Sequence, residues 1–168
     1  GGVGAVMRAA EAAIRTLGHR SDFADWHEVA GRGEWRMTTG ALRELAHRFG
    51  LVPGAKTVTE PIEYASAAFY RGFLRGLFDA DGSVQGSQEK GVSVRLAQSD
   101  LPALKAVQRM LLRLGIMSRL YADRRPEGSA RLPDGRGGTA DYQTRSQHEL
   151  VVSGGNLERF SWRIGFGD

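Results

Sequence analysis

Cysteine is absent from this 168-residue chain, which excludes several kinds of chemistry. Without it there are no disulfides, no thiolate metal sites and no cysteine nucleophile. The lack of cysteine says little about the cellular compartment. Only four histidines occur, scattered without metal-ligand spacing: His19, His27, His47 and His148. No apolar run approaches the roughly 18 residues that a membrane helix needs, and no signal peptide is visible. We therefore expect a soluble, intracellular protein, cytoplasmic or nucleoid-associated, with no membrane partner.

The charge balance is mildly basic, with 23 lysines and arginines against 19 aspartates and glutamates. The net charge of +4 is compatible with a polyanionic partner, although many soluble proteins are as basic. Hydrophobic residues make up 41% of the chain, which is typical of a globular protein. The length suffices for one substantial domain or for two small ones that share a core.

One stretch, residues 73–82, combines an apolar helical pattern with two terminal acids. Its hydrophobic side chains recur at helical spacing and predict a buried face: Leu74, Leu77 and Phe78. Gly72 and Gly76 lie four residues apart on one helix face, where the missing side chains would admit a second backbone. Because each glycine costs a helix about 1 kcal/mol relative to alanine, the pair predicts a packing requirement.

Asp79 and Asp81 lie at the C-terminal end of this predicted helix, and Gly82 is expected to end it in a left-handed conformation. The helix dipole is negative at that end and disfavours carboxylates. A positive group should offset this cost, and a divalent metal is the obvious candidate.

Residues 74–82, LRGLFDADG, resemble the nine-residue motif of the LAGLIDADG homing endonucleases, in the dodecapeptide form found inside inteins. The resemblance implies an α+β fold of duplicated αββαββα units, with antiparallel DNA-binding sheets forming a saddle and the motif helix at a pseudo-twofold interface. It also implies a sequence-specific double-stranded DNA endonuclease that hydrolyses phosphodiesters with Mg²⁺ or Mn²⁺. In the family the penultimate acid of the motif binds the metal, and in this chain that acid is Asp81.

Capping residues, glycines and apolar periodicity place the other elements. Thr39 and Asp100 are expected to cap helices, and Gly18, Gly50 and Gly115 to end them. The expected helices are 4–17, 39–49, 66–82, 100–115 and 156–164; the expected strands are 21–29, 34–38, 83–88, 91–98, 116–124 and 142–152, with loops at 52–61 and 125–140.

Two pieces of the first half recur in the second half. Residues 39–51 align with residues 154–166, and the helix end at Gly18 aligns with that at Gly115. The alignment predicts a truncated first repeat in residues 1–62 and a second repeat, with the motif helix, in residues 63–168; chance similarity of amphipathic helices is the alternative. A partner acid for Asp81 would precede residue 1. The first motif is therefore missing, and we expect a portion of an intein-type nuclease region.

Two residues are expected to take part in catalysis, Asp81 and Lys56. Carboxylates suit Mg²⁺, so Asp81 is the expected metal ligand with the Ala80 carbonyl as a helper, the alternative being a solvated acid. Asp79 is expected to serve helix packing or capping, the alternative being direct ligation of the metal. Lys56 resembles the lysine that intein endonucleases carry before the second motif, where an ammonium polarises water or stabilises phosphorane charge; the alternative is a surface lysine. One acid and one lysine, where the family has two of each, put autonomous cleavage in doubt.

The strand faces that point away from the helices are expected to bind DNA, because a two-stranded ribbon fits the major groove. The side chains expected to read base edges are Gln85, Ser87, Ser93, Arg95, Arg119, Tyr121, Gln143, Arg145 and Gln147. Those expected to contact phosphates are Arg124, Arg125, Arg131 and Arg136, with Lys90 at a hairpin tip. Taken singly, each is an ordinary exposed residue; as a set they predict a DNA surface.

The expected partner is double-stranded DNA with a long specific target site. The motif helix is expected to pair with a second copy of the chain or with a missing first-motif segment. Two other functions stay open: a non-catalytic DNA-binding protein on the same fold, such as a regulator or an RNA-splicing cofactor, and a structural fragment that only pairs with the absent segment. Asp81 and Lys56 favour the nuclease, and the missing first motif favours the non-catalytic binder.

Overall fold

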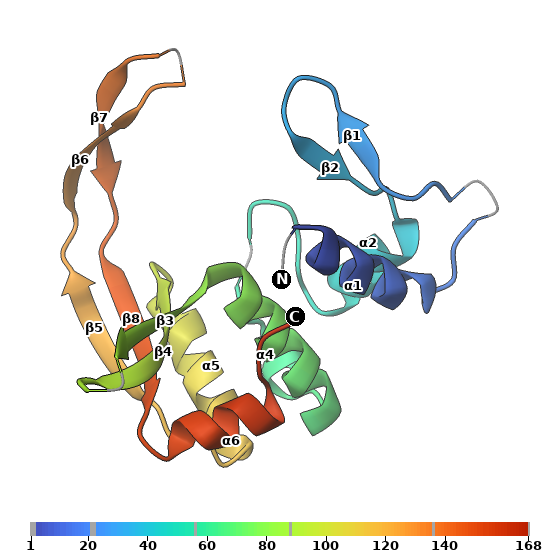
Figure 1. Cartoon of the computed structure of the whole chain (residues 1–168). Helices are drawn as coiled ribbons and strands as arrows, with labels where there is room; N and C mark the ends of the chain where they lie inside the picture. The colour runs from blue at the N-terminus through green and yellow to red at the C-terminus, as the bar shows by residue number, and fades with distance from the viewer. Residues whose placement is uncertain (1–2, 21–22, 56, 88, 136, 168) are drawn as a thin grey trace. The chain divides into compact units, whose positions relative to one another are not determined.

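The computed structural model describes residues 3–20, 23–55, 57–87, 89–135 and 137–167. The chain divides into two compact units: unit 1 comprises Gly1–Pro61 with Gly167–Asp168, and unit 2 comprises Ile62–Phe166 (Figure 1). Within the described ranges, no helix is both long enough and apolar enough to cross a membrane.

Unit 1 contains two helices and one short hairpin. Helix α1 spans Val3–Arg15 and helix α2 spans Gly40–Arg48; between them strand β1 (His27–Val29) pairs with strand β2 (Glu34–Arg36). Thr39 caps α2 as predicted, because its side chain accepts a hydrogen bond from the Leu42 amide. Both strands are shorter than predicted, since only three residue pairs lie in register.

A short helix, α3 (Glu60–Glu63), leads into the motif helix α4 (Ala67–Asp81). Ser66 begins α4 as predicted, with its hydroxyl accepting a hydrogen bond from the Phe69 amide at 3.2 Å. The Glu63 carboxylate accepts two hydrogen bonds from Arg109 of helix α5 (Leu101–Arg113), at 2.5 and 2.7 Å. These bonds, with the nearby positive charges, hold the pKa of Glu63 below its ordinary value.

Unit 2 is built on a four-stranded antiparallel sheet in the order β3-β4-β8-β5. Its strands are β3 (Gly82–Ser87), β4 (Gly91–Gln98), β5 (Arg119–Arg125) and β8 (Gln147–Ser153). Helices α4, α5 and α6 (Asn156–Arg163) lie on one side of this sheet (Figure 1). The element order of unit 2 is helix, two strands, helix, four strands, helix, which is the order of the predicted αββαββα fold with one added hairpin, β6 and β7.

The core lies between these helices and the sheet. Alternate residues of the two central strands are buried there, Val94 and Leu96 from β4 and Leu150 and Val152 from β8. The predicted stripe on α5 is also buried: Leu104, Val107, Leu111 and Leu114. The rings of Phe78 in α4 and Phe160 in α6 meet edge to face, with their centroids 4.8 Å apart.

Residues 125–140, predicted to be a loop, form much of a second hairpin instead. Strand β6 (Gly128–Pro133) pairs with strand β7 (Thr139–Thr144), so the single strand predicted at 142–152 is two strands, β7 and β8. We call this hairpin the β6–β7 ribbon; it continues β5 and β8 away from the helices (Figure 1). The loop prediction was wrong because proline and glycine of this segment lie at a strand end and in the turn, where they do not interrupt the strand pairing. Pro133 is the last residue of β6, and Gly135 and Gly137 have positive φ in the turn.

Candidate functional site

The motif helix α4 is amphipathic and buries one face. Tyr70, Leu74 and Phe78 are buried, and Leu77 is half-buried. On the other face Gly72 and Gly76 are exposed, and a Cβ atom built on either would meet no atom within 4 Å. The close backbone approach predicted at these glycines is therefore not made among the described residues of unit 2, and the two positions leave room for another element.

Asp81 is the last residue of α4 and its side chain is exposed. Its Oδ2 atom accepts a hydrogen bond from the Gln98 side-chain amide at 2.7 Å. Gln98 ends β4, and sequence reasoning missed it. No pattern within one segment marks Gln98, because its position follows from the register: Gly82 pairs with Leu96, and continuing that antiparallel pairing two residues further brings Gln98 beside the end of α4. In the structure, Gln98 therefore orients the carboxylate of Asp81, the predicted metal ligand.

Gly82 ends α4 for a reason other than the predicted one. Its φ is −79°, so the expected left-handed conformation is wrong. A Cβ atom at this position would lie 2.4 Å from the carbonyl oxygen of Phe78, which is far inside van der Waals contact. Glycine is required here for space, because the chain passes directly from the helix into β3 while its backbone N–H still donates to Phe78.

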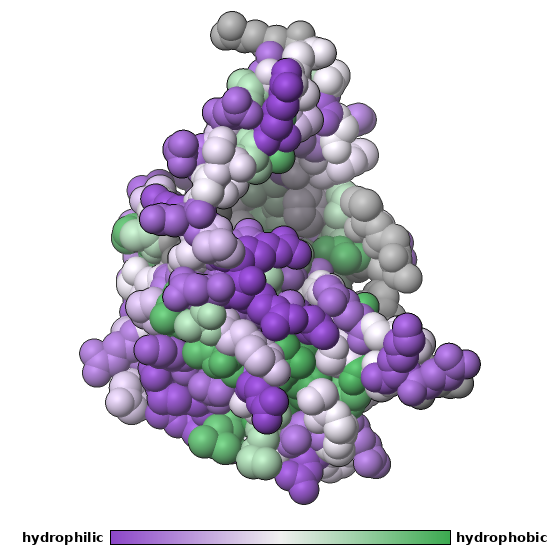
Figure 2. Space-filling model, turned by 90° about the vertical axis from the view of Figure 1, so that its left-hand side faces the viewer, coloured by the Kyte–Doolittle hydropathy of each residue, from purple (hydrophilic) through white to green (hydrophobic). Residues whose placement is uncertain are grey.

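The sheet of unit 2 has an open face that points away from the helices. The register places on it the side chains paired as Ser83 with Arg95, Gln85 with Ser93, Tyr121 with Glu149, and Arg125 with Gln147. Hydrophilic side chains cover much of the surface seen from the side of the β6–β7 ribbon, with hydrophobic side chains between them (Figure 2). We call this polar surface of the four-stranded sheet the open face.

Most predicted DNA-contact residues of the sheet are accessible, but Ser93 is not. Gln85, Ser87, Lys90, Arg119, Arg124, Arg125 and Gln147 are exposed, and Arg95 and Tyr121 are half-buried. Ser93 is only 8% exposed, which corrects its assignment as a base-reading residue. Its hydroxyl donates to the Gln85 carbonyl at 3.3 Å and accepts from Arg95 Nε at 3.0 Å. β4 is an interior strand, so longer neighbours cover its short side chain.

The remaining predicted contacts belong to the β6–β7 ribbon and its base. Arg131 and Gln143 are exposed and fall on one face of the ribbon, since Ser129 pairs with Gln143 and Arg131 with Asp141. Arg145 is exposed in the connection between β7 and β8. Arg136, a predicted phosphate contact, and Lys56, a predicted catalytic residue, lie outside the described residues.

Sequence reasoning also missed Glu149, the acid at the centre of the open face. Its carboxylate is 3.3 Å from Arg95 Nη1 and 3.4 Å from Arg124 Nε. The Arg124 guanidinium lies 5.2 Å from the centroid of the Tyr121 ring. A hydrogen bond with Tyr121 is the main cause that raises the pKa of Arg119 above its ordinary value. Strand alternation alone marks Glu149 as outward-facing, but only the register shows that arginines surround it.

Comparison with protein families gives a match to the LAGLIDADG-like domain over residues 68–165, which is more than half of the chain. The chain belongs to the LAGLIDADG-like domain family. The matched segment contains α4 from its second residue, including Asp81, together with the neighbouring Gln98 and all four strands of the sheet.

Curated relatives of this LAGLIDADG-like domain chain are much longer proteins. The NrdEB α subunit of ribonucleoside-diphosphate reductase from Bacillus subtilis (strain 168) is 29% identical over 122 residues, which are 71% of this chain and 11% of that protein. The DNA polymerase of Thermococcus litoralis is 28% identical over 155 residues, 91% of this chain and 8% of the polymerase. The RNA polymerase subunit Rpo1C of Methanocaldococcus jannaschii is 26% identical over 100 residues, 60% and 11% of the two chains.

Solved structures of the homing endonuclease I-DmoI share the fold. An I-DmoI variant in complex with its target DNA nicked in the coding strand, in the presence of Mn, superposes with a TM-score of 0.59 at 17% identity, covering 95% of this chain and 71% of that one. Mesophilic I-DmoI variants give a TM-score of 0.55 at 15% identity, covering 95% and 69%. The predicted α+β LAGLIDADG architecture is thereby confirmed.

Asp81 can supply one carboxylate ligand to a divalent metal whose other ligands are water and phosphate oxygens. Among the residues that the structure describes, no group of three or more histidines, aspartates and glutamates is placed to hold a metal ion. A single exposed carboxylate at a helix end is nevertheless the kind of donor that Mg²⁺ uses, because this ion takes one or two protein carboxylates and fills the rest with water and phosphate oxygens. Asp79 and Ala80 are exposed beside it.

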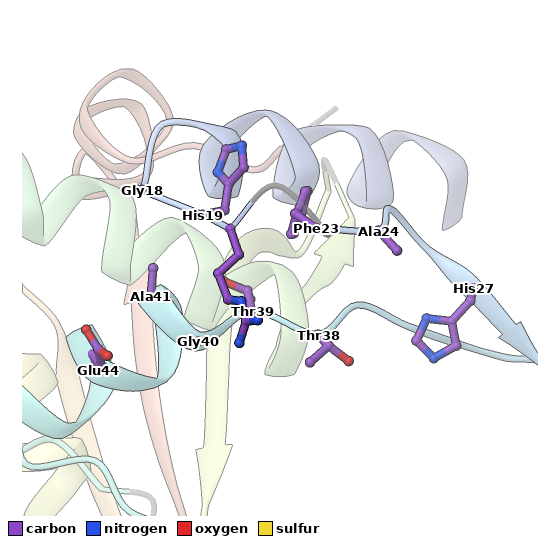
Figure 3. A pocket seen from close by; sticks show the side chains of 11 residues that line it. Gly18, His19, Phe23, Ala24, His27, Thr38, Thr39, Gly40, Ala41 and Glu44 are labelled. Atoms are coloured by element: carbon purple, nitrogen blue, oxygen red, sulfur yellow. The ribbon is translucent and has the colours of Figure 1, made fainter.

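Unit 1 contains a cavity of about 660 Å³ between the segment after α1 and the start of α2 (Figure 3). Its lining includes His19, Phe23, His27, Thr39 and Glu44, and the rings of His19 and Phe23 lie 4.7 Å apart. The described lining contains no residue that the sequence predicts for catalysis or DNA binding. The cavity and the site around Asp81 therefore have no described residue in common.

Proposed function

We propose that this chain is the nuclease part of an intein-encoded homing endonuclease that hydrolyses double-stranded DNA at a long specific site. One observation carries the proposal: Asp81 is exposed at the end of the motif helix, is oriented by Gln98, and directly precedes the first strand of a sheet with a basic, polar open face. A nuclease needs these parts side by side, because the sheet would position the phosphodiester and the carboxylate would hold the metal.

Asp81 would be the protein ligand of Mg²⁺ or Mn²⁺, with the Ala80 carbonyl as a second donor. The metal would activate a water and neutralise the developing phosphorane charge. The Gln98 amide donates to one oxygen of the Asp81 carboxylate and so restrains its side-chain conformation, in which the carboxylate would hold the metal. We retain Lys56 as the candidate that stabilises charge at the phosphate.

The identity of the relatives supports the intein assignment. A ribonucleotide reductase, a DNA polymerase and an RNA polymerase subunit catalyse different reactions, yet each resembles this chain over only 8% to 11% of its length. A short shared segment in otherwise different enzymes is expected for an inserted element with its own activity. We infer that the common segment is such an insertion.

The exposed Gly72 and Gly76 face supports a partner for the motif helix. We propose that residues 1–62 are a truncated first repeat and residues 63–168 the second repeat. The first motif helix and its acid would then come from a segment outside this chain or from a second copy, which would also complete the DNA saddle.

The alternative is a non-catalytic DNA-binding protein on the same fold. It is favoured by one observation: among the described residues, no group of three or more histidines, aspartates and glutamates is placed to hold a metal ion. The two functions differ in what Asp81 does, because a pure binder needs the sheet and not the metal.

The test is Mg²⁺-dependent cleavage of a randomised duplex library, read by sequencing the cut ends. Asp81→Asn should keep DNA binding and lower cleavage by about 100-fold or more, the scale for removing one electrostatic group from a reacting centre. Asp79→Asn is the matched control, because it removes the neighbouring carboxylate and leaves Asp81 in place; it should keep cutting. Selective binding without metal-dependent cutting by the unmodified chain would establish the binder instead.

A further inference from the structure

A carboxylate at the centre of a surface proposed to bind a polyanion is unfavourable, and Glu149 occupies that position. Its side chain is only 14% exposed, so it is partly desolvated, and it would repel nearby DNA phosphates. Removing this carboxylate would strengthen nonspecific binding of DNA. A compensating role must therefore lie in what Glu149 does to its neighbours.

Glu149 restrains two arginines at once. Arg95 Nη1 lies 3.4 Å from Oε1 and 3.3 Å from Oε2, and Arg124 Nε lies 3.4 Å from Oε2. Each arginine has a second restraint: Arg95 Nε donates to the Ser93 hydroxyl at 3.0 Å, and Arg124 lies over the Tyr121 ring. Long guanidinium side chains are thus ordered before any ligand arrives, which lowers the entropy cost of binding in one geometry.

The donors and acceptors of this cluster match one base pair. Arginine donors fit the O6 and N7 acceptors of guanine in the major groove, and a carboxylate accepts from the N4 amino group of cytosine. The Glu149 carboxylate has lone pairs beyond those that face Arg95 and Arg124, because two oxygens offer about four acceptor sites. A purely basic cluster would instead bind phosphates anywhere along the duplex.

We propose that Glu149 is a specificity-determining residue that positions Arg95 and Arg124 to read a G·C pair and accepts a hydrogen bond from its cytosine. The inference rests on the proposed function and deepens it, since it names what the centre of the open face recognises. Ser93, which is buried and accepts a hydrogen bond from Arg95, acts as a positioning residue in the same cluster.

The experiment is a binding selection from a randomised duplex library, with the salt dependence of affinity measured for the enriched sequence and for random duplex. The unmodified chain should require a G·C pair at one position. Glu149→Gln keeps the size of the side chain and removes its charge; it should reduce the preference at that position about tenfold and leave affinity for random duplex equal or higher. Arg95→Gln should lose the preference at the same position.

Glu158→Gln is the matched control, because it removes one exposed carboxylate from α6, on the helix side of the sheet, and should change neither preference nor affinity. A Glu149→Gln protein that melts earlier or binds all duplexes more weakly, with its base preference intact, would show that Glu149 is only structural. If the unmodified chain enriches no duplex at all, the proposed DNA-binding function itself fails. The two failures are therefore distinguishable.

Discussion

The two units end their helices in the same way and differ in how many hydrophobic side chains they bury. Both have a helix that ends at a glycine with positive φ, Gly50 after α2 and Gly115 after α5. Yet every buried hydrophobic side chain among the described residues lies in unit 2, from Ile62 to Ile164. Unit 2 has a four-stranded sheet to cover its helices, whereas unit 1 has a hairpin of two three-residue strands.

This difference shows that a correct local pattern does not make a core. A two-stranded hairpin is marginally stable and too small to cover a helix face, whereas four strands provide a surface on which three helices bury their apolar stripes. We infer that unit 2 supplies the stability of the chain. Substitutions at matched positions in the two units, or within unit 2, test that assignment.

The largest effect is expected from removing a core aromatic ring. Phe78→Ala should lower the free energy of unfolding by about 3–5 kcal/mol, because it leaves a cavity and removes the edge-to-face contact with Phe160. Leu45→Ala in α2 should cost about 1 kcal/mol, since that side chain is only half-buried. Urea unfolding followed by circular dichroism measures both. Equal costs would break the distinction between the units.

A smaller effect is expected from adding one methyl group at the end of the motif helix. Gly82→Ala should destabilise the chain by about 1–3 kcal/mol, because the new Cβ atom would collide with the Phe78 carbonyl oxygen. Gly72→Ala places the same methyl where nothing lies within 4 Å and should stabilise α4 by up to about 1 kcal/mol. Thermal melts distinguish the signs. A costly Gly72→Ala in the isolated chain would mean that this helix face is already covered.

A pH-dependent effect is expected from Glu63. Its pKa is lowered in the folded chain, chiefly by the hydrogen bond from Arg109, so its contribution to stability is present above the unfolded pKa. That contribution is lost as the pH falls through the lower, folded pKa. Glu63→Gln should therefore melt earlier than the unmodified chain near neutral pH, and the two melting temperatures should converge at acid pH. Parallel curves would show that the ionised carboxylate contributes nothing.

The smallest effect is expected at Arg15 in unit 1. Its contacts with Glu11 and Asp25 raise its pKa, the hydrogen bond to Glu11 most, but the side chain is exposed and solvent screens the pairing. Arg15→Gln should leave the melting temperature unchanged within error at 0.15 M salt. A clear shift would show that unit 1 depends on charge pairing in place of a core.

Local physics made much of the architecture predictable. Ser66, Thr39 and Asp100 cap helices in the structure because a short polar side chain can satisfy a free backbone N–H wherever it occurs. The apolar stripe of α5 and the alternation of β4 follow from helix and strand periods. The metal-binding role proposed for Asp81 came from the family resemblance, because periodicity alone assigns no chemistry to a residue.

Contacts between distant segments were decided only by the tertiary structure. The hydrogen bond from Gln98 to Asp81, the burial of Ser93 and the arginines around Glu149 all depend on which strands pair and in what register. The β6–β7 ribbon depends likewise on pairing across its turn. Composition and periodicity report what one segment prefers by itself, so they place helix ends and buried faces. A site made from the end of one helix and three strands exists only after those segments have packed together.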